Sequence, residues 1–161
     1  MSTLVRNTEP LASVMVAQIK MLAERVGAGA SFHLDATATA ITAANASDLA
    51  TSLTLAEQIR GVYSAHLDDD AAHKLADPKP TLVAATTLAT AITLANAIKS
   101  DYNTHRASTT YHYNADATNA VSSADATDQS SLNTLLNEIK TDINAHMASG
   151  PAGSLAQLIS A

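Results

Sequence analysis

The chain of 161 residues contains no cysteine and no tryptophan, and only 3% of its residues are aromatic. The absence of cysteine excludes a disulfide framework and a zinc site built from thiolates. With so few aromatic side chains, the core must come from Ala, Leu, Ile and Val, which allow helices to pack closely. The length suits one domain, which can bury about two-thirds of its unfolded surface.

Basic residues are scarce as well. Nine Lys and Arg residues are scattered along the chain, against fifteen Asp and Glu, and the formal net charge is −6. Binding to a phosphate backbone needs clustered basic side chains, so we expect no nucleic-acid partner. The first twenty residues include Glu9, Pro10 and Lys20 and hold no apolar run long enough for export or for a membrane span. We therefore expect synthesis in the cytoplasm and no membrane partner.

Sequence signatures of catalysis are also missing. The chain has no Gly-rich phosphate loop, no nucleophile elbow and no nucleotide fingerprint. A di-metal hydrolase centre in a helical bundle draws glutamates from mid-helix positions, and the chain has only four glutamates. We expect no enzyme activity and assign no catalytic residue.

What the chain does contain is an internal repeat. Residues 57–77 and 96–116 are two copies of one segment, and every matching pair is separated by 39 positions. A partial third copy carries His146 at an offset of 41, and a fainter earlier copy carries His33 at an offset of 40. All six histidines therefore belong to one repeating unit. The principal matched pairs are Ile59 and Ile98, Tyr63 and Tyr102, His66 and His105, His73 and His112, and Asp77 and Asp116.

Apolar residues recur at helical spacing in four stretches, which predict four helices. The stretches cover about residues 11–26, 49–63, 81–102 and 132–143. Ser47 or Asp48 is placed as the N-cap of the second helix, Pro80 stands just before the third, and Thr127 or Asp128 precedes the fourth. We expect an all-α fold, a four-helix up-and-down bundle of helix-plus-long-loop repeats of about 40 residues each. The bundle would cover residues 1–148, with a C-terminal tail at residues 149–161.

The connections are long for a compact domain. About eighteen residues separate the first predicted helix from the second, and the third from the fourth. Residues 35–37 and 116–118 both read Asp-Ala-Thr, so each long loop is expected to follow a defined path across the bundle. Only about a dozen residues would join the second and third helices, and this short connection favours the up-and-down arrangement.

The histidines fall into two groups of three. His66, His105 and His146 are expected in the last turn of a helix, where the macrodipole favours a cation by about 0.3–1 kcal/mol. The others are expected in loops, each with an aspartate two or four residues later. These loop histidines are His33, His73 and His112, and the aspartates are Asp35, Asp77 and Asp116.

Imidazole and carboxylate groups in this pattern support two interpretations. Together they can bind zinc or another divalent first-row metal. The same groups can form hydrogen-bonded His–Asp braces that hold a loop on a helix end. Because no known metal-binding spacing such as His-Glu-x-x-His is present, the brace is the favoured interpretation and a metal site the alternative.

The direction of the helices determines which histidines meet. In an up-and-down bundle, one pole would collect His33, His105 and His112 with Asp35 and Asp116. The other pole would collect His66, His73 and His146 with Asp77. If the long loops instead returned the chain so that the helices ran parallel, all six histidines would lie at one end. We expect the two-pole arrangement.

Residues 95–105 read Ala-Asn-Ala-Ile-Lys-x-x-Tyr-Asn-x-His, and the pattern continues to His112, Asp116 and Asn119. Over about residues 55–147 this pattern resembles repeats in uncharacterised structural proteins of tailed bacteriophages. The resemblance implies a non-enzymatic structural subunit of the virion, such as a capsid, neck or tail accessory protein. Its partners would be copies of itself and other virion proteins. The alternative hypothesis is a histidine-rich, metal-binding helical protein whose cofactor is zinc or another divalent metal.

Overall fold

The computed structural model describes residue 33 and residues 39–69, 72–75, 77–78, 80–112 and 114–149. This part of the chain is all-helical, with three α-helices and no strand. The helices are α2 (Leu49–Leu67), α3 (Leu88–Ala107) and α4 (Gln129–Ala148). The first predicted helix, Asp35 and residues 150–161 of the predicted tail lie outside the described residues. The all-α prediction is confirmed for the described part. The predicted helix at about residues 11–26 stays a prediction.

Each helix begins at a matching position of the repeat, and the same kind of side-chain pair defines each start. The N-cap side chain accepts a hydrogen bond from the backbone N–H three residues later. The side-chain hydroxyl of that later residue accepts a hydrogen bond from the N–H of the N-cap residue. This reciprocal arrangement satisfies two backbone donors that the helix leaves without partners. The N-cap and hydroxyl pairs are Asp48 with Thr51, Thr87 with Thr90, and Asp128 with Ser131.

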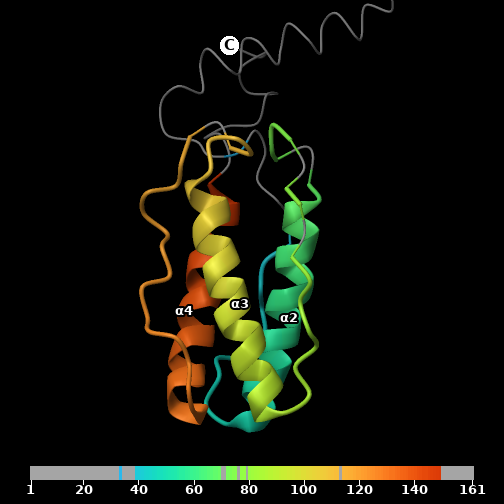
Figure 1. The fold of residues 1–161 in the computed structure, drawn as a ribbon, viewed down its shortest axis with the longest axis vertical. Helices are drawn as coiled ribbons and strands as arrows, with labels where there is room; N and C mark the ends of the chain where they lie inside the picture. The colour runs from blue at the N-terminus through green and yellow to red at the C-terminus, as the bar shows by residue number, and fades with distance from the viewer. Residues whose placement is uncertain are drawn as a thin grey trace, which may run out of the picture.

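These caps confirm two predicted helix starts and correct the third. Asp48 and Asp128 are N-caps as predicted. The third helix begins at Leu88 and not near Thr81, because Thr87 caps it and residues 80–86 run as an extended segment (Figure 1). The connection from α2 to α3 therefore covers residues 68–87, which is longer than the dozen residues predicted.

The three helices run parallel, which corrects the up-and-down prediction. In Figure 1 each helix begins at the lower end of the molecule and ends at the upper end, as its colours show. Near the helix starts, Ser52 of α2 donates a hydrogen bond to Asn133 of α4 (2.7 Å). About ten extended residues span about 33 Å, and a helix of twenty residues is about 30 Å long, so each long connection can return the chain along a whole helix.

Residues 39–48, 80–87 and 119–128 form the three return segments, which run back along the outside of the bundle before each helix (Figure 1). No described strand pairs with them, so their backbone groups bind side chains instead. Asn137 of α4 accepts from the N–H of Ala46 (2.7 Å) and donates to its carbonyl (3.1 Å). Asn96 of α3 does the same for Ala126, at 2.8 and 3.0 Å.

These contacts close the bundle into a ring. A third contact of the same kind joins the carboxylate of Glu57 on α2 to the N–H of Ala85. Each helix therefore holds the return segment of the following helix, and α4 holds the return segment of α2. Glu57, Asn96 and Asn137 are separated by the repeat offsets of 39 and 41. Each helix also packs against the other two, so the described repeats surround an approximate threefold axis parallel to the helices.

The core lies between the helices and beneath the return segments. Ile41 and Val121 reach into it from two of those segments, and alanines at positions 46, 85 and 126 let the segments approach the helices closely. No helix among the described residues is long and apolar enough to cross a membrane. The helices contribute fully buried aliphatic side chains, including Leu55, Ile59, Ile98, Leu135, Leu136, Ile139 and Ile143.

Candidate metal centre

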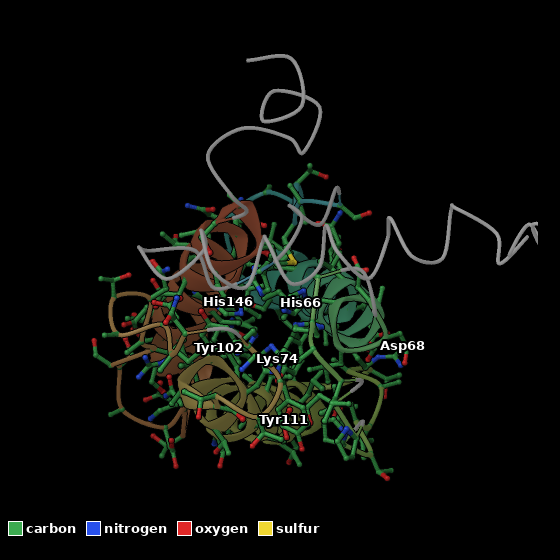
Figure 2. The ribbon with its side chains drawn as sticks, turned by 90° about the horizontal axis from the view of Figure 1, so that it is seen from above. His66, Asp68, Lys74, Tyr102, Tyr111 and His146 are labelled. Atoms are coloured by element: carbon green, nitrogen blue, oxygen red, sulfur yellow. The ribbon has the colours of Figure 1, made fainter. Side chains whose placement is uncertain are left out.

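All six histidines lie together at the end of the bundle where the three helices end, and none is more than 2% exposed. Figure 2, viewed from above that end, shows His66 and His146 near the middle of the ring of helices. The predicted division of the histidines between two poles is wrong. The parallel alternative, with all six at one end, is the observed arrangement because the return segments give the helices one direction.

The histidines form two triads. The helix triad consists of His66, His105 and His146, which lie in the last turns of α2, α3 and α4 as predicted. Its ring centroids are 5.1–5.5 Å apart. The loop triad consists of His33, His73 and His112, whose ring centroids are 5.0–5.2 Å apart.

Two members of the helix triad are oriented by buried or half-buried carboxylates. Nδ1 of His105 lies 2.7 Å from Oδ2 of Asp77, and Nδ1 of His146 lies 2.9 Å from Oδ2 of Asp116. A carboxylate can only accept here, so each Nδ1 carries the proton and each Nε2 keeps its lone pair. An acceptor behind a ligating imidazole is the usual outer-shell arrangement of histidine metal sites.

Two members of the loop triad are oriented in the same way by backbone carbonyls. Nδ1 of His73 lies 3.1 Å from the carbonyl oxygen of Asp69, and Nδ1 of His112 lies 3.1 Å from that of Ser108. Each carbonyl comes from the residue four positions earlier. The acceptors fix the proton on Nδ1, so Nε2 carries the lone pair in these two rings.

Burial keeps four of the six imidazoles neutral. Desolvation, followed by repulsion from neighbouring imidazolium groups, lowers the pKa of His33 to about 2 and that of His112 to about 3. The same two causes hold the pKa values of His66 and His105 well below their ordinary value. Neutral imidazole is the form that binds a metal ion, so these four side chains need no deprotonation at pH 7.

Some of the buried nitrogens have no hydrogen-bond partner. Nδ1 of His66 and Nε2 of His112 are both in this state among the described residues. A buried polar atom left without a partner costs about 1–3 kcal/mol, so a ligand bound at Nε2 of His112 would stabilise the fold. One nitrogen each from His33, His66, His73 and His112 lie within 4.8 Å of one another, and so do those from His66, His105, His112 and His146.

The predicted aspartates act as braces. Asp77 and Asp116 each follow a loop histidine by four residues, but each binds the helix histidine of the next repeat unit. Burial raises the pKa of Asp116, and hydrogen bonds from His146, Asn119 and Thr118 outweigh burial and hold that pKa well below its ordinary value. Asp35 lies outside the described residues.

Sequence reasoning missed the backbone carbonyls of Asp69 and Ser108 and the support that Asn119 gives to Asp116. Asn119 donates from its side chain to Oδ2 (2.7 Å) and from its backbone to Oδ1 (3.0 Å) of Asp116. The Asp-x-x-Asn spacing was a visible signal for the contact between Asn119 and Asp116. The carbonyls have no side-chain signature, so only the fold reveals them.

Comparison of the chain with protein-family models, with curated protein sequences and with solved structures gives no significant match.

Proposed function

We propose that the chain is a non-enzymatic, metal-binding helical protein, in which the histidine cluster holds one divalent first-row transition metal ion as a structural centre. The observation that carries this proposal is the burial of six imidazoles around one point, four of them with an acceptor at Nδ1. An apolar core gains nothing from gathering six buried heterocycles, since each must give up its hydration. A shared metal ion supplies the missing interaction.

A structural role is favoured over a catalytic one by the burial of the ligands. A catalytic metal keeps a coordination position open to water or substrate. Here every imidazole is at most 2% exposed, and imidazoles from both triads surround the centre. The ion would instead tie the C-terminal ends of α2, α3 and α4 to His33 and to the connections that leave α2 and α3.

Elemental analysis of the purified chain, followed by thermal unfolding with and without a strong chelator, tests this proposal. We expect about one equivalent of a transition metal per chain and a lower melting temperature after chelation, because binding to the folded state alone stabilises it. The control variant Thr134→Ala, on an exposed face of α4, should behave as the unaltered protein. A chain that takes up no metal and melts at the same temperature with chelator would rule the proposal out.

The virion subunit implied by the phage resemblance stays a prediction. A metal-braced bundle is compatible with such a subunit, because an assembly needs rigid parts more than it needs catalysis. Its partners, copies of the chain and other virion proteins, would be tested by sedimentation of the purified chain and by its detection in purified particles.

A further inference from the structure

The two histidine triads are staggered about the approximate threefold axis. Each loop histidine has its ring centroid 4.4–5.1 Å from two members of the helix triad. His33 neighbours His66 and His146, His73 neighbours His66 and His105, and His112 neighbours His105 and His146.

Two staggered triangles of nearly equal edges are the opposite faces of an octahedron. Within each triad the centroids are 5.0–5.5 Å apart, and between neighbouring members of the two triads they are 4.4–5.1 Å apart. The remaining three pairs then occupy opposite corners, and each joins a loop histidine to a helix histidine. These opposite pairs are His33 and His105, His66 and His112, and His73 and His146.

We infer that the proposed metal centre is a six-coordinate, octahedral site in which all six histidines bind one divalent ion; the inference rests on the proposed function. The ion would lie on the threefold axis between the two triads. The two four-histidine groups described above share His66 and His112, which are opposite corners, and together they include all six residues. We take them as overlapping halves of one site.

The nitrogen distances favour six-coordination over four. With metal–nitrogen bonds of about 2.1 Å, neighbouring ligand atoms lie about 3.0 Å apart in an octahedron and about 3.4 Å apart in a tetrahedron. Nε2 of His66 and Nε2 of His105 form a hydrogen-bonded pair 3.1 Å apart, which is close to the separation of neighbouring octahedral ligands. Opposite ligand atoms of an octahedron would be about 4.2 Å apart, and the one opposite pair within these groups, His66 and His112, lies within 4.8 Å.

The charge of the site matches a divalent ion. Six neutral imidazoles leave the full charge of the ion uncompensated, and an uncompensated buried charge costs several kcal/mol. Asp77 and Asp116 each place one carboxylate directly behind a ligating histidine. A dication with these two carboxylates forms a neutral unit.

The class of ion follows from the coordination number. Zinc has no geometric preference from its d-electrons and is bound almost always by four ligands in structural sites. Octahedral coordination by imidazole suits ions such as Fe²⁺, Co²⁺ and Ni²⁺. We therefore expect the site to prefer Ni²⁺ and Co²⁺ over Zn²⁺ when the metals compete at equal concentration.

Cobalt binding to the full chain tests the coordination number directly, because Co²⁺ reports its geometry in its visible spectrum. The chelator-treated protein is titrated with Co²⁺, and in parallel Ni²⁺ and Zn²⁺ compete for the site. We expect one equivalent of Co²⁺ with the weak absorption of a six-coordinate ion, and displacement by Ni²⁺ at a lower concentration than by Zn²⁺.

Two variants at opposite corners provide a second measurement. Either four-histidine group contains His33 or His105 but not both. We expect His33→Gln and His105→Gln each to weaken Co²⁺ binding by about tenfold or more, with Thr134→Ala as the matched control. Circular dichroism verifies that each variant is folded. The visible Co²⁺ spectrum of the unaltered protein tests the coordination number even if a variant fails to fold.

The outcomes separate the two proposals. The intense visible absorption of four-coordinate Co²⁺, or full affinity in one of the two folded histidine variants, would overturn six-coordination while leaving a metal-binding protein. No uptake of Co²⁺, Ni²⁺ or Zn²⁺ would overturn both the six-coordinate site and the proposed function.

Discussion

Asp77, in the connection that leaves α2, accepts a hydrogen bond from Nδ1 of His105 on α3, with 2.7 Å between the two atoms. Asp116 stands in the same relation to His146, one repeat later. The aspartate of one connection thus orients the histidine of the following helix. Because an imidazole with its Nδ1 proton fixed presents its Nε2 lone pair in one direction, these contacts prepare the cluster before any ion enters.

Replacing one of these carboxylates should weaken the metal site without removing a ligand. We expect Asp116→Asn to lower metal affinity by about 10–100-fold, because the amide keeps the shape but loses the charge and the strong acceptor behind His146. Competition with a coloured chelator measures the affinity. Asp125→Asn, at an exposed carboxylate that pairs with Lys99, is the control. Equal affinity in the Asp116→Asn variant would contradict an orienting role for this aspartate.

The metal-free protein should lose stability as the pH falls below about 6.5. Burial lowers the pKa of His33 to about 2 and of His112 to about 3, whereas the unfolded chain binds these protons at the ordinary value of 6.5. The unfolded state therefore carries more protons between pH 6.5 and 3, and the stability present above pH 6.5 is lost across that window.

Denaturant unfolding of the chelator-treated chain at pH 7.5, 6.5 and 5.5 measures this dependence. Each such histidine contributes at most about 1.4 kcal/mol per pH unit. The double variant His33→Gln with His112→Gln removes two of the titrating groups, so its stability should fall less steeply with acidification. A metal-free protein equally stable at pH 7.5 and 5.5 would show that these histidines are not held neutral.

The asparagines that hold the return segments should be important for folding. Asn96→Ala leaves the N–H and the carbonyl of Ala126 without their partner, and we expect it to destabilise the fold by about 1–3 kcal/mol. Asn96→Asp keeps the acceptor and loses the donor, so it should lie in between. Thr93→Ala, at an exposed position of the same helix, serves as the control in denaturant unfolding. A change within error of that control would refute a holding role for Asn96.

The helix caps give a prediction independent of the metal. Asp128→Ala removes the side chain that accepts from the N–H of Ser131, and the expected cost is about 0.5–2 kcal/mol. Asp128→Ser keeps a capping oxygen and should retain most of the stability. Thermal unfolding of both variants compares them, and equal losses would mean that the cap itself contributes little.

The helices were largely predictable because their signals are local. Asp48 and Asp128 have capping side chains directly before a helical apolar pattern, and both are N-caps. The third start was placed too early because residues 81–87 continue a pattern of apolar and small side chains. Thr87 and Thr90 form the capping box at its true start, and Glu57 binds the N–H of Ala85 in the extended segment before it. A contact across 28 residues leaves no mark in a local pattern.

The six histidines were predictable as members of one repeat unit that also carries aspartates, but which histidine each aspartate binds was not. Their meeting point was not, because it depends on the direction of each helix. An error of about seven residues at the start of α3 shortened the predicted connection and changed parallel helices into antiparallel ones. That single error separated residues that lie beside one another, such as His66 and His105.

By itself, the sequence determined the repeat, the helical periodicity, two of the three described helix caps and the placing of every histidine in one unit. These follow from side chains that interact within a few positions along the chain. The tertiary structure alone determined that the helices run parallel, that both histidine triads meet at one end, and that Asp77 and Asp116 brace the next helix. These features depend on where extended return segments bind, and that binding is a sum of contacts between residues distant in the chain.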